Sequence, residues 1–135
     1  MKNNNEQKIQ WQSIKYIVFD FDGIFTNNKV YVSQSGEEAV RCDRSDGLGI
    51  NMLKKFAALK KWNPEIFILS KEKNPVVLKR AEKLQIKCHH GIDDKERFLR
   101  NYYNKIDNSS TIKGLVYLGN DLNDLKAIRV AEYSI

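Results

Sequence analysis

Short apolar segments that alternate with amphipathic segments are the feature that most constrains the fold of this chain. The apolar runs are rich in β-branched and aromatic residues, which is typical of strands buried on both faces: 16–19, 66–69 and 115–118. Around them, apolar residues recur with helical spacing at 46–59, 75–84, 93–104 and 121–130. Strands that alternate with helices in this way predict an α/β fold with a mainly parallel central sheet.

Three further segments complete the expected topology. Residues 29–33 alternate in polarity, residues 34–37 are turn-like, and residues 39–42 can return as the second strand of a hairpin. Residues 86–90 form a short strand-like segment, and residues 133–135 resemble the start of another strand. The helix predicted from residue 46 has apolar side chains on one face: Leu48, Met52, Leu53, Phe56 and Leu59.

The chain has 135 residues, which is enough for one compact domain with its own core. We expect a polar extension over residues 1–13 and a single domain over residues 14–135. No apolar run reaches the roughly 20 residues that span a membrane, and the polar N-terminus lacks the apolar core of a secretory signal. The two cysteines, Cys42 and Cys88, indicate reduced thiols and a cytoplasmic location.

The formal net charge of +6 favours anionic partners such as phosphorylated metabolites, nucleic acids or acidic lipids. The basic residues, however, are spread along the predicted helices, as at Lys54, Lys60 and Lys79. This spread is typical of solvated helix faces. We therefore expect no nucleic-acid partner and no membrane partner.

Polar residues follow each predicted strand at the point where it ends. The ligand site of an open parallel sheet lies beyond the carboxyl ends of its strands, so these residues are expected to converge. They supply carboxylates, a hydroxyl, an amide and ammonium groups: Asp20, Asp22, Gly23, Ser70, Lys71, Asp93, Asp94, Lys95, Asn120, Asp121 and Asp124. Such a set is suited to holding Mg²⁺ and a phosphate group together.

The spacing of Asp20 and Asp22 suggests a mechanism. In an extended segment, residues i and i+2 project to the same side, so both carboxylates can face one site. One carboxylate can attack phosphorus, and the other can protonate the leaving oxygen and later activate water. Gly23 permits a sharp turn and the close approach of a ligand. Mg²⁺ would offset the repulsion between a carboxylate nucleophile and a phosphate.

Simpler roles compete with the catalytic ones. Ser70 can hydrogen-bond a phosphate, but serine is also a favoured helix N-cap. Lys95 can neutralise charge on the transferring group, or it can be a surface lysine at a helix start. Asp124 can belong to the site or cap a helix locally.

Two other patterns carry less weight. Cysteines and histidines at Cys42, Cys88, His89 and His90 lack the spacing of a zinc site, so we interpret them as buried or incidental. Gly47 and Gly49 lack the third glycine and the preceding strand of a nucleotide-binding loop.

Four motifs in the same order resemble those of the haloacid dehalogenase (HAD) superfamily of phosphohydrolases. Residues 20–26 look like the first motif, Ser70 and Lys95 are similar to the second and third, and residues 119–124 are similar to the fourth. The resemblance covers about residues 14–135.

Two segments point to a branch of this superfamily. The hairpin and residues 45–50 resemble the small-flap subgroup typified by 3-deoxy-D-manno-octulosonate 8-phosphate phosphatase. Residues 68–77 and 91–95 resemble more closely the phosphatase-like domain associated with bacterial N-acylneuraminate cytidylyltransferases. The resemblance implies a Rossmann-like three-layer sandwich with a hairpin flap at about residues 25–43 and no large cap. It also implies a homotetramer in which the flap of one subunit helps to close a neighbour's site.

The resemblance implies a role for each matching position. Asp20 would be the nucleophile and a Mg²⁺ ligand, and Asp22 the acid/base that binds the metal through its carbonyl. Phosphate would be bound by Gly23, Ser70, Lys71 and Lys95, and metal also by Asn120, Asp121 and Asp124. Arg44 is a candidate for binding the substrate. It lies one place before the position where this subgroup often has arginine.

The chain departs from the family pattern at two points. Asn120 replaces an aspartate that usually ligates the metal, so we expect weaker Mg²⁺ binding, with Asp121 compensating and Asp124 orienting the ligands. The chain also ends at Ile135, where relatives continue through another strand and a tail that helps to cover the substrate.

Two functional hypotheses follow. The first is a Mg²⁺-dependent phosphomonoesterase that acts on a phosphorylated 3-deoxy-2-keto sugar acid of the octulosonate 8-phosphate or nonulosonate 9-phosphate type. The second is a weakly active or inactive oligomerisation module that partners an N-acylneuraminate cytidylyltransferase. A phosphotransferase would need a larger cap to exclude water, and the sequence has no room for one.

Overall fold

The computed structural model describes residues 9–104 and 111–135, and its centre is a parallel sheet with the strand order β5-β4-β1-β6-β7. The strands of this sheet are β1 (Tyr16–Phe19), β4 (Glu65–Leu69), β5 (Lys87–His89), β6 (Ile112–Leu118) and β7 (Ala131–Ser134). A separate antiparallel hairpin is formed by β2 (Thr26–Val32) and β3 (Glu38–Cys42). This arrangement confirms the predicted α/β fold with a mainly parallel sheet and a small hairpin.

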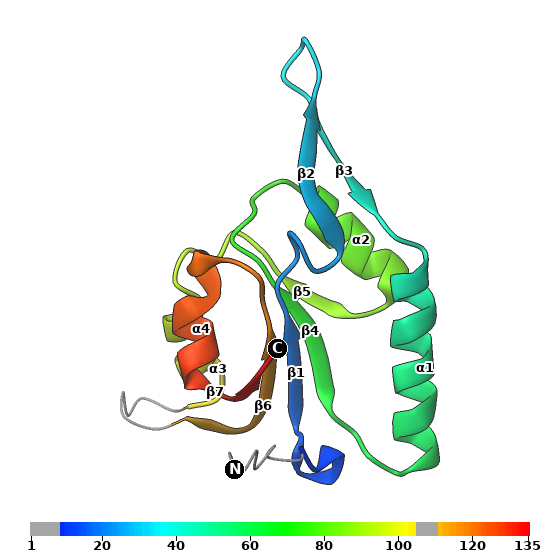
Figure 1. Ribbon diagram of the computed structural model, residues 1–135, viewed down its shortest axis with the longest axis vertical. Helices are drawn as coiled ribbons and strands as arrows, with labels where there is room; N and C mark the ends of the chain where they lie inside the picture. The colour runs from blue at the N-terminus through cyan, green and yellow to red at the C-terminus, as the bar shows by residue number, and fades with distance from the viewer. Residues whose placement is uncertain (1–8, 105–110) are drawn as a thin grey trace, which may run out of the picture.

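Helices cover both faces of the sheet and make three layers (Figure 1). The α-helices are α1 (Ser45–Leu59), α2 (Val76–Leu84), α3 (Lys95–Tyr102) and α4 (Leu125–Val130), and the 3₁₀ turns are η1 (Trp11–Ser13) and η2 (Leu122–Asp124). α1 and α2 lie on one side, and α3 and α4 on the other (Figure 1).

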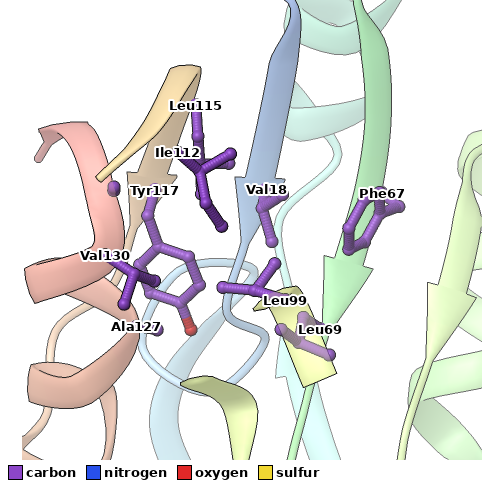
Figure 2. Packing of buried hydrophobic residues seen from close by; sticks show 10 residues of the cluster. Val18, Phe67, Leu69, Leu99, Ile112, Leu115, Tyr117, Ala127 and Val130 are labelled. Atoms are coloured by element: carbon purple, nitrogen blue, oxygen red, sulfur yellow. The ribbon is translucent and has the colours of Figure 1, made fainter. Parts of the chain in front are cut away.

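Each face of the sheet has its own apolar core, because neighbouring residues of a strand point to opposite faces. Phe67 and Leu69 of β4 pack with Leu99 of α3 and Val130 of α4, as Figure 2 shows. Ile68, between them in the sequence, packs instead with the side of α1 and α2. The alternation within one short strand therefore explains why its sequence is apolar at each position from Ile66 to Leu69.

The central position of β1 determines where the polar loops meet. β1 pairs in parallel with β4 on one side and with β6 on the other. The loops that follow these strands therefore emerge at one edge, and the hairpin projects beyond the same edge (Figure 1). The Asp20 amide donates to the Leu118 carbonyl at 2.8 Å, which joins two of these loops at their origin.

Two predicted helices differ in detail from the structure. Residues 121–130 form η2 and then α4 instead of one helix, and η2 begins with a capping box made by Asp121 and Asp124. The apolar face predicted for α1 is largely exposed: Leu48, Met52 and Leu59 are 64%, 62% and 83% exposed. The buried residues of this helix are instead Ile50 and Ala57.

The terminal and loop predictions are tested only where the chain is described. Residues 1–8 of the predicted N-terminal extension, and residues 105–110, lie outside the described residues. Beyond them, Trp11 packs edge-on against Phe56 and Trp62 at ring distances of 5.1 and 5.4 Å. In the described part of the chain, no helix has the length and apolar character needed to cross a membrane.

Candidate active site

A cavity of about 260 Å³ lies at the carboxyl edge of the sheet, beneath the start of the hairpin. Most of the residues predicted for the site line this one cavity, although they come from four separate strand ends. Its walls are formed by Asp20, Asp22, Asn28, Val30, Ser70, Lys71, Glu72, Lys95, Asp121 and Asn123. The structure therefore brings together carboxylates, a hydroxyl and ammonium groups within the reach of a small anionic ligand.

The Lys95 side chain is buried in the wall of the cavity. Its Nζ donates to Asp20 Oδ1 at 2.8 Å and to Asp124 Oδ1 at 2.6 Å. The side chain of Lys95 is only 4% exposed, and that of Asp20 is 11% exposed. A buried ammonium is stable only when carboxylates compensate its charge, so Lys95 is not the surface lysine that the sequence allowed.

Two aspartates beside Lys95 have different environments. Burial raises the pKa of Asp20 above its usual value, and the nearby Lys95 only partly opposes this effect. Burial would also raise the pKa of Asp124, but hydrogen bonds from Lys95 and Tyr117 outweigh it and lower that pKa. Asp124 is therefore the firmly ionised partner of Lys95, whereas Asp20 is held less tightly as an anion.

Asp124 lies behind the cavity wall and is fully buried. Oδ1 accepts from Lys95 and from the Tyr117 hydroxyl, and Oδ2 accepts from the amides of Asn120 and Asp121 at 3.2 and 3.3 Å. Both carboxylate oxygens thus have partners within the protein. This environment suits the orienting role predicted for Asp124 better than the role of a metal ligand.

Asp22 lies on the cavity wall and is half-buried. Its pKa is raised by burial and then by the negative charge of Glu72, an effect that a hydrogen bond from Thr26 opposes. The Thr26 hydroxyl also accepts from the amides of Gly23 and Asn28, each at 3.1 Å. These bonds close the loop after β1 into a tight turn that aims Asp22 at the cavity.

Ser70 follows β4 and is buried, with its Oγ accepting from the Glu72 amide at 3.1 Å. The simpler role of a helix N-cap does not apply, because α2 begins only at Val76 and Asn74 accepts from the Val76 amide. The amides nearest to Ser70 therefore belong to its own loop and not to the helix that the sequence suggested.

Like Asp124, three further predicted residues do not line the cavity. The side chain of Asn120 lies over Gly23, so close that a β-carbon built on Gly23 would be 1.8 Å from Asn120 Nδ2. Gly23 has φ +82°, a conformation that glycine adopts without strain. Arg44 is exposed just before α1 and does not line the cavity.

Sequence reasoning missed several residues that the structure places at the site. Glu72, Asn28, Val30 and Asn123 line the cavity. Glu72 lies two residues after Ser70, and Asn123 lies within the fourth motif, so extending each motif by a few residues would have found them. Asn28 and Val30 come from the hairpin, whose position over the site no local pattern reveals.

The lining residues fit a small, hard cation. Asp20, Asp22 and Asp121 present carboxylate oxygens to one cavity. Among the described residues, no group of three or more His, Cys, Asp or Glu side chains is arranged to hold a metal ion. Mg²⁺ does not need such a group, because it commonly uses one or two carboxylates and keeps several waters.

Solved structures of known proteins share this fold. A HAD family hydrolase from Streptomyces avermitilis has a TM-score of 0.78 and 36% identity, over 93% of this chain and 68% of that one. The 3-deoxy-D-manno-octulosonate 8-phosphate phosphatase from Moraxella catarrhalis, solved with magnesium, phosphate and KDO, has a TM-score of 0.75 and 29% identity. That match covers 92% of this chain and 68% of the phosphatase.

A curated relative extends the comparison. N-acylneuraminate cytidylyltransferase A of Danio rerio is 28% identical over 121 residues, which cover 90% of this chain. The chain spans only 27% of that relative's length. No protein-family model matches the sequence.

Proposed function

The chain belongs to the HAD family of hydrolases, and from this premise we propose that it is a Mg²⁺-dependent phosphomonoesterase that acts on a phosphorylated 3-deoxy-2-keto sugar acid. One observation carries the proposal: the Asp20 carboxylate, at the end of the central strand, contacts Lys95 and lines a cavity with Asp22 and Ser70. In this proposal Asp20 is the nucleophile, Asp22 the acid/base and Ser70 a phosphate donor.

The reaction has two steps at phosphorus. A carboxylate oxygen of Asp20 attacks the phosphorus atom, and the bond to the sugar oxygen breaks as that oxygen takes a proton from Asp22. Asp22 then removes a proton from water, whose oxygen attacks the aspartyl-phosphate and releases inorganic phosphate and free Asp20. The raised pKa of Asp22 favours the protonated form that the first step needs.

Other residues prepare the reactants. Ser70 and Lys71 line the cavity at the end of β4 and would hold the phosphate oxygens, while Lys95 holds one oxygen of Asp20. Mg²⁺, bound by Asp20, Asp121 and the Asp22 carbonyl, would offset the repulsion between carboxylate and phosphate. Asn120 lies beside Gly23 and supplies an amide in place of a carboxylate, so we expect weak Mg²⁺ binding.

The substrate class rests on the family branch. The sequence resembles sugar-acid phosphatases, and the Moraxella catarrhalis relative was solved with KDO. A sugar acid phosphate carries two anionic groups, and this chain has a net charge of +6. The free thiols of Cys42 and Cys88 support the reducing cytoplasm as the compartment.

We also propose that the chain assembles as a homotetramer through the flap, by which we mean the hairpin Thr26–Cys42. Val30, Tyr31 and Val32 of the flap are 56%, 59% and 61% exposed, and the apolar face of α1 is exposed as well. Apolar surface of this kind usually marks a contact between proteins. Val30 also lines the cavity, so a neighbour that orders the flap would help to close the site.

A second candidate is an oligomerisation module that partners an N-acylneuraminate cytidylyltransferase. The match to the Danio rerio cytidylyltransferase, together with the exposed apolar residues, favours this reading. The two candidates differ in whether phosphate release depends on Asp20.

The experiment measures phosphate release from octulosonate 8-phosphate and nonulosonate 9-phosphate with Mg²⁺. We expect release by the wild-type chain and none above background by Asp20→Asn. Asp93→Asn, an exposed aspartate outside this cavity, is the matched control and should retain activity. Equal rates for wild type and Asp20→Asn, or no release at all, would favour the module.

A further inference from the structure

Tyr117 is a buried phenol that the proposed reaction does not use. It belongs to β6, and its ring packs against Val130 and Ala127 with the hydroxyl pointing toward the carboxyl ends of the strands (Figure 2). The residue is fully buried and does not line the cavity. A buried hydroxyl at this position needs partners, and both of them belong to the site.

The hydroxyl joins two charged groups. It accepts from Lys95 Nζ at 3.1 Å and donates to Asp124 Oδ1 at 2.7 Å. Burial and the hydrogen bond to Asp124 raise the pKa of Tyr117 far above its usual range. Because a carboxylate oxygen only accepts, the phenol is the donor in its hydrogen bond to Asp124, and the direction of that bond is fixed.

These contacts use all the protons of the lysine. An ammonium group has three N–H donors. In Lys95 the acceptors are Asp124 Oδ1 at 2.6 Å, the Tyr117 hydroxyl at 3.1 Å and Asp20 Oδ1 at 2.8 Å. Two of these acceptors lie behind the cavity wall, so they fix the rotation of the ammonium and direct its third proton to Asp20.

We propose that Tyr117 is a positioning residue, whose hydroxyl holds the Lys95 ammonium in the rotation that directs one N–H to Asp20. The inference rests on the proposed function of Asp20 as the nucleophile. Without the hydroxyl, one N–H of Lys95 has no acceptor, and the ammonium turns toward other oxygens. Asp20 then loses its fixed orientation for attack, while the cavity wall that binds substrate stays intact.

The first test is kinetic and uses Tyr117→Phe, which removes only the hydroxyl. We expect kcat to fall about tenfold, the effect of losing one hydrogen bond to a charged group, with KM within about twofold of wild type. Tyr102→Phe is the matched control, because its hydroxyl donates to the Glu65 carboxylate at 2.7 Å, away from the cavity. Tyr102→Phe should leave kcat unchanged. A Tyr117→Phe enzyme with the kcat of wild type would overturn the inference.

The second test does not depend on activity. Ammonium protons held in hydrogen bonds exchange slowly with water and give a resolved ¹H–¹⁵N NMR signal, whereas those of exposed lysines such as Lys71 do not. We expect such a signal for Lys95 in the wild-type chain and in Tyr102→Phe, assigned by its absence in Lys95→Met. In Tyr117→Phe the signal should broaden or disappear. A signal that Tyr117→Phe leaves unchanged would contradict the inference.

The two tests separate this inference from the proposed function. If the wild-type chain releases no phosphate, the proposed function fails, and the NMR comparison alone decides whether Tyr117 fixes Lys95. If thermal unfolding shows that Tyr117→Phe does not fold, the wild-type spectrum decides. A folded wild-type chain without a slowly exchanging Lys95 signal would overturn the inference.

Discussion

The site is bordered by two regions that are held in opposite ways. The Lys95 cluster, which consists of Asp20, Lys95, Tyr117 and Asp124, is buried and joined by hydrogen bonds within the chain. The flap projects beyond the sheet (Figure 1), and in the described part of the chain its two strands pair only with each other; more than half of Val30 is exposed. Among the described residues, contacts within the chain therefore fix the positions of the Lys95 cluster. The flap instead exposes apolar surface that another protein chain can cover.

The difference separates two tasks of a hydrolase. Groups that react at phosphorus need a fixed geometry, which buried and mutually hydrogen-bonded side chains provide. Closure over a substrate needs a part that can adjust, and an exposed hairpin has few contacts that oppose movement. Substitutions in the two regions should therefore affect different properties.

The largest effect on stability is expected for Lys95→Met. This variant tests whether the Lys95 cluster stabilises the fold as well as supporting phosphate release. The substitution leaves the carboxylates of Asp20 and Asp124 buried without a cation. We expect the free energy of unfolding, measured with urea, to fall by about 3–5 kcal/mol, together with loss of phosphate release. The control is Lys87→Met, which breaks the exposed pair with Glu65 at 2.9 Å and should change stability little. Equal losses for both variants would contradict the contrast.

A matched pair of glycines compares the two regions at the same backbone conformation. Gly23 beside the cluster has φ +82°, and Gly36 in the flap turn has φ +84°. Substitution by alanine at either position should lower the free energy of unfolding by about 1–2 kcal/mol, because a β-carbon is strained in the left-handed backbone conformation. Only at Gly23 does a β-carbon meet Asn120, whereas nothing lies within 4 Å at Gly36.

We therefore expect Gly23→Ala to displace Asn120 and to raise the Mg²⁺ concentration that gives half-maximal phosphate release. Gly36→Ala should leave this concentration unchanged while it loses similar stability. A titration with Mg²⁺ checks both variants. If the two respond alike, the position of Asn120 has no bearing on metal use.

A smaller effect, on the pH dependence of stability, is expected at His89 in β5. His89 is packed against Phe67, Phe98 and Tyr102, and its buried Nε2 has no hydrogen-bond partner among residues 9–104 and 111–135. Burial, with the positive charge of Lys87, lowers the pKa of His89 below its usual 6.5. As the pH falls through 6.5, the His89 side chain therefore binds a proton more readily in the unfolded chain than in the folded one, which favours unfolding.

Stability should therefore be complete above pH 7 and should decline as the pH falls below 6.5. The part due to His89 is expected to be about 1 kcal/mol or less, because the ring is only half-buried. Urea unfolding at pH 7.5 and 5.5 checks this, with His89→Phe as the comparison. Between pH 7.5 and 5.5, the free energy of unfolding should fall less for His89→Phe than for wild type. An equal fall in both proteins would rule out His89 as the cause.

The smallest effect on stability is expected in the flap itself. The double variant Tyr31→Ser, Val32→Thr should change the free energy of unfolding of the monomer by no more than about 0.5 kcal/mol, because both side chains are exposed. Leu99→Ala, in the core beside the cluster, should cost about 2–5 kcal/mol. Light scattering should show that the flap variant, unlike Leu99→Ala, has lost the tetramer. A tetramer that persists in the flap variant would place the contact elsewhere.

The fold could be predicted largely because its signals are local. Four-residue apolar runs such as Tyr16–Phe19 identify buried strands, and polar residues at their ends mark the loops. The capping box at the start of η2 was missed because it depends on two side chains, Asp121 and Asp124, that act together on one turn. The exposed face of α1 was hidden for another reason: periodicity identifies an apolar face but not what covers it.

The site could be predicted in part for the same reason. Asp20 and Ser70 directly follow β1 and β4, and Lys95 begins the helix after β5, so the topology brings them together. The contact of Lys95 with Tyr117 could not be inferred, because Tyr117 reads in the sequence as one more apolar strand residue. Glu72 and Asn28 were missed because their positions depend on how a loop turns and where the hairpin lies.

The position of β1 in the sheet also determines when the site can form. β1 needs β4 on one side and β6 on the other, and Lys95 follows Asp20 by 75 residues. Contacts so distant in sequence form late and slow the folding of a domain. During synthesis, Asp20 is made early, but it stays solvated until first Lys95 and then β6 have been synthesised. The chemical centre is therefore among the last parts of the molecule to form, and its completion depends on the whole sheet.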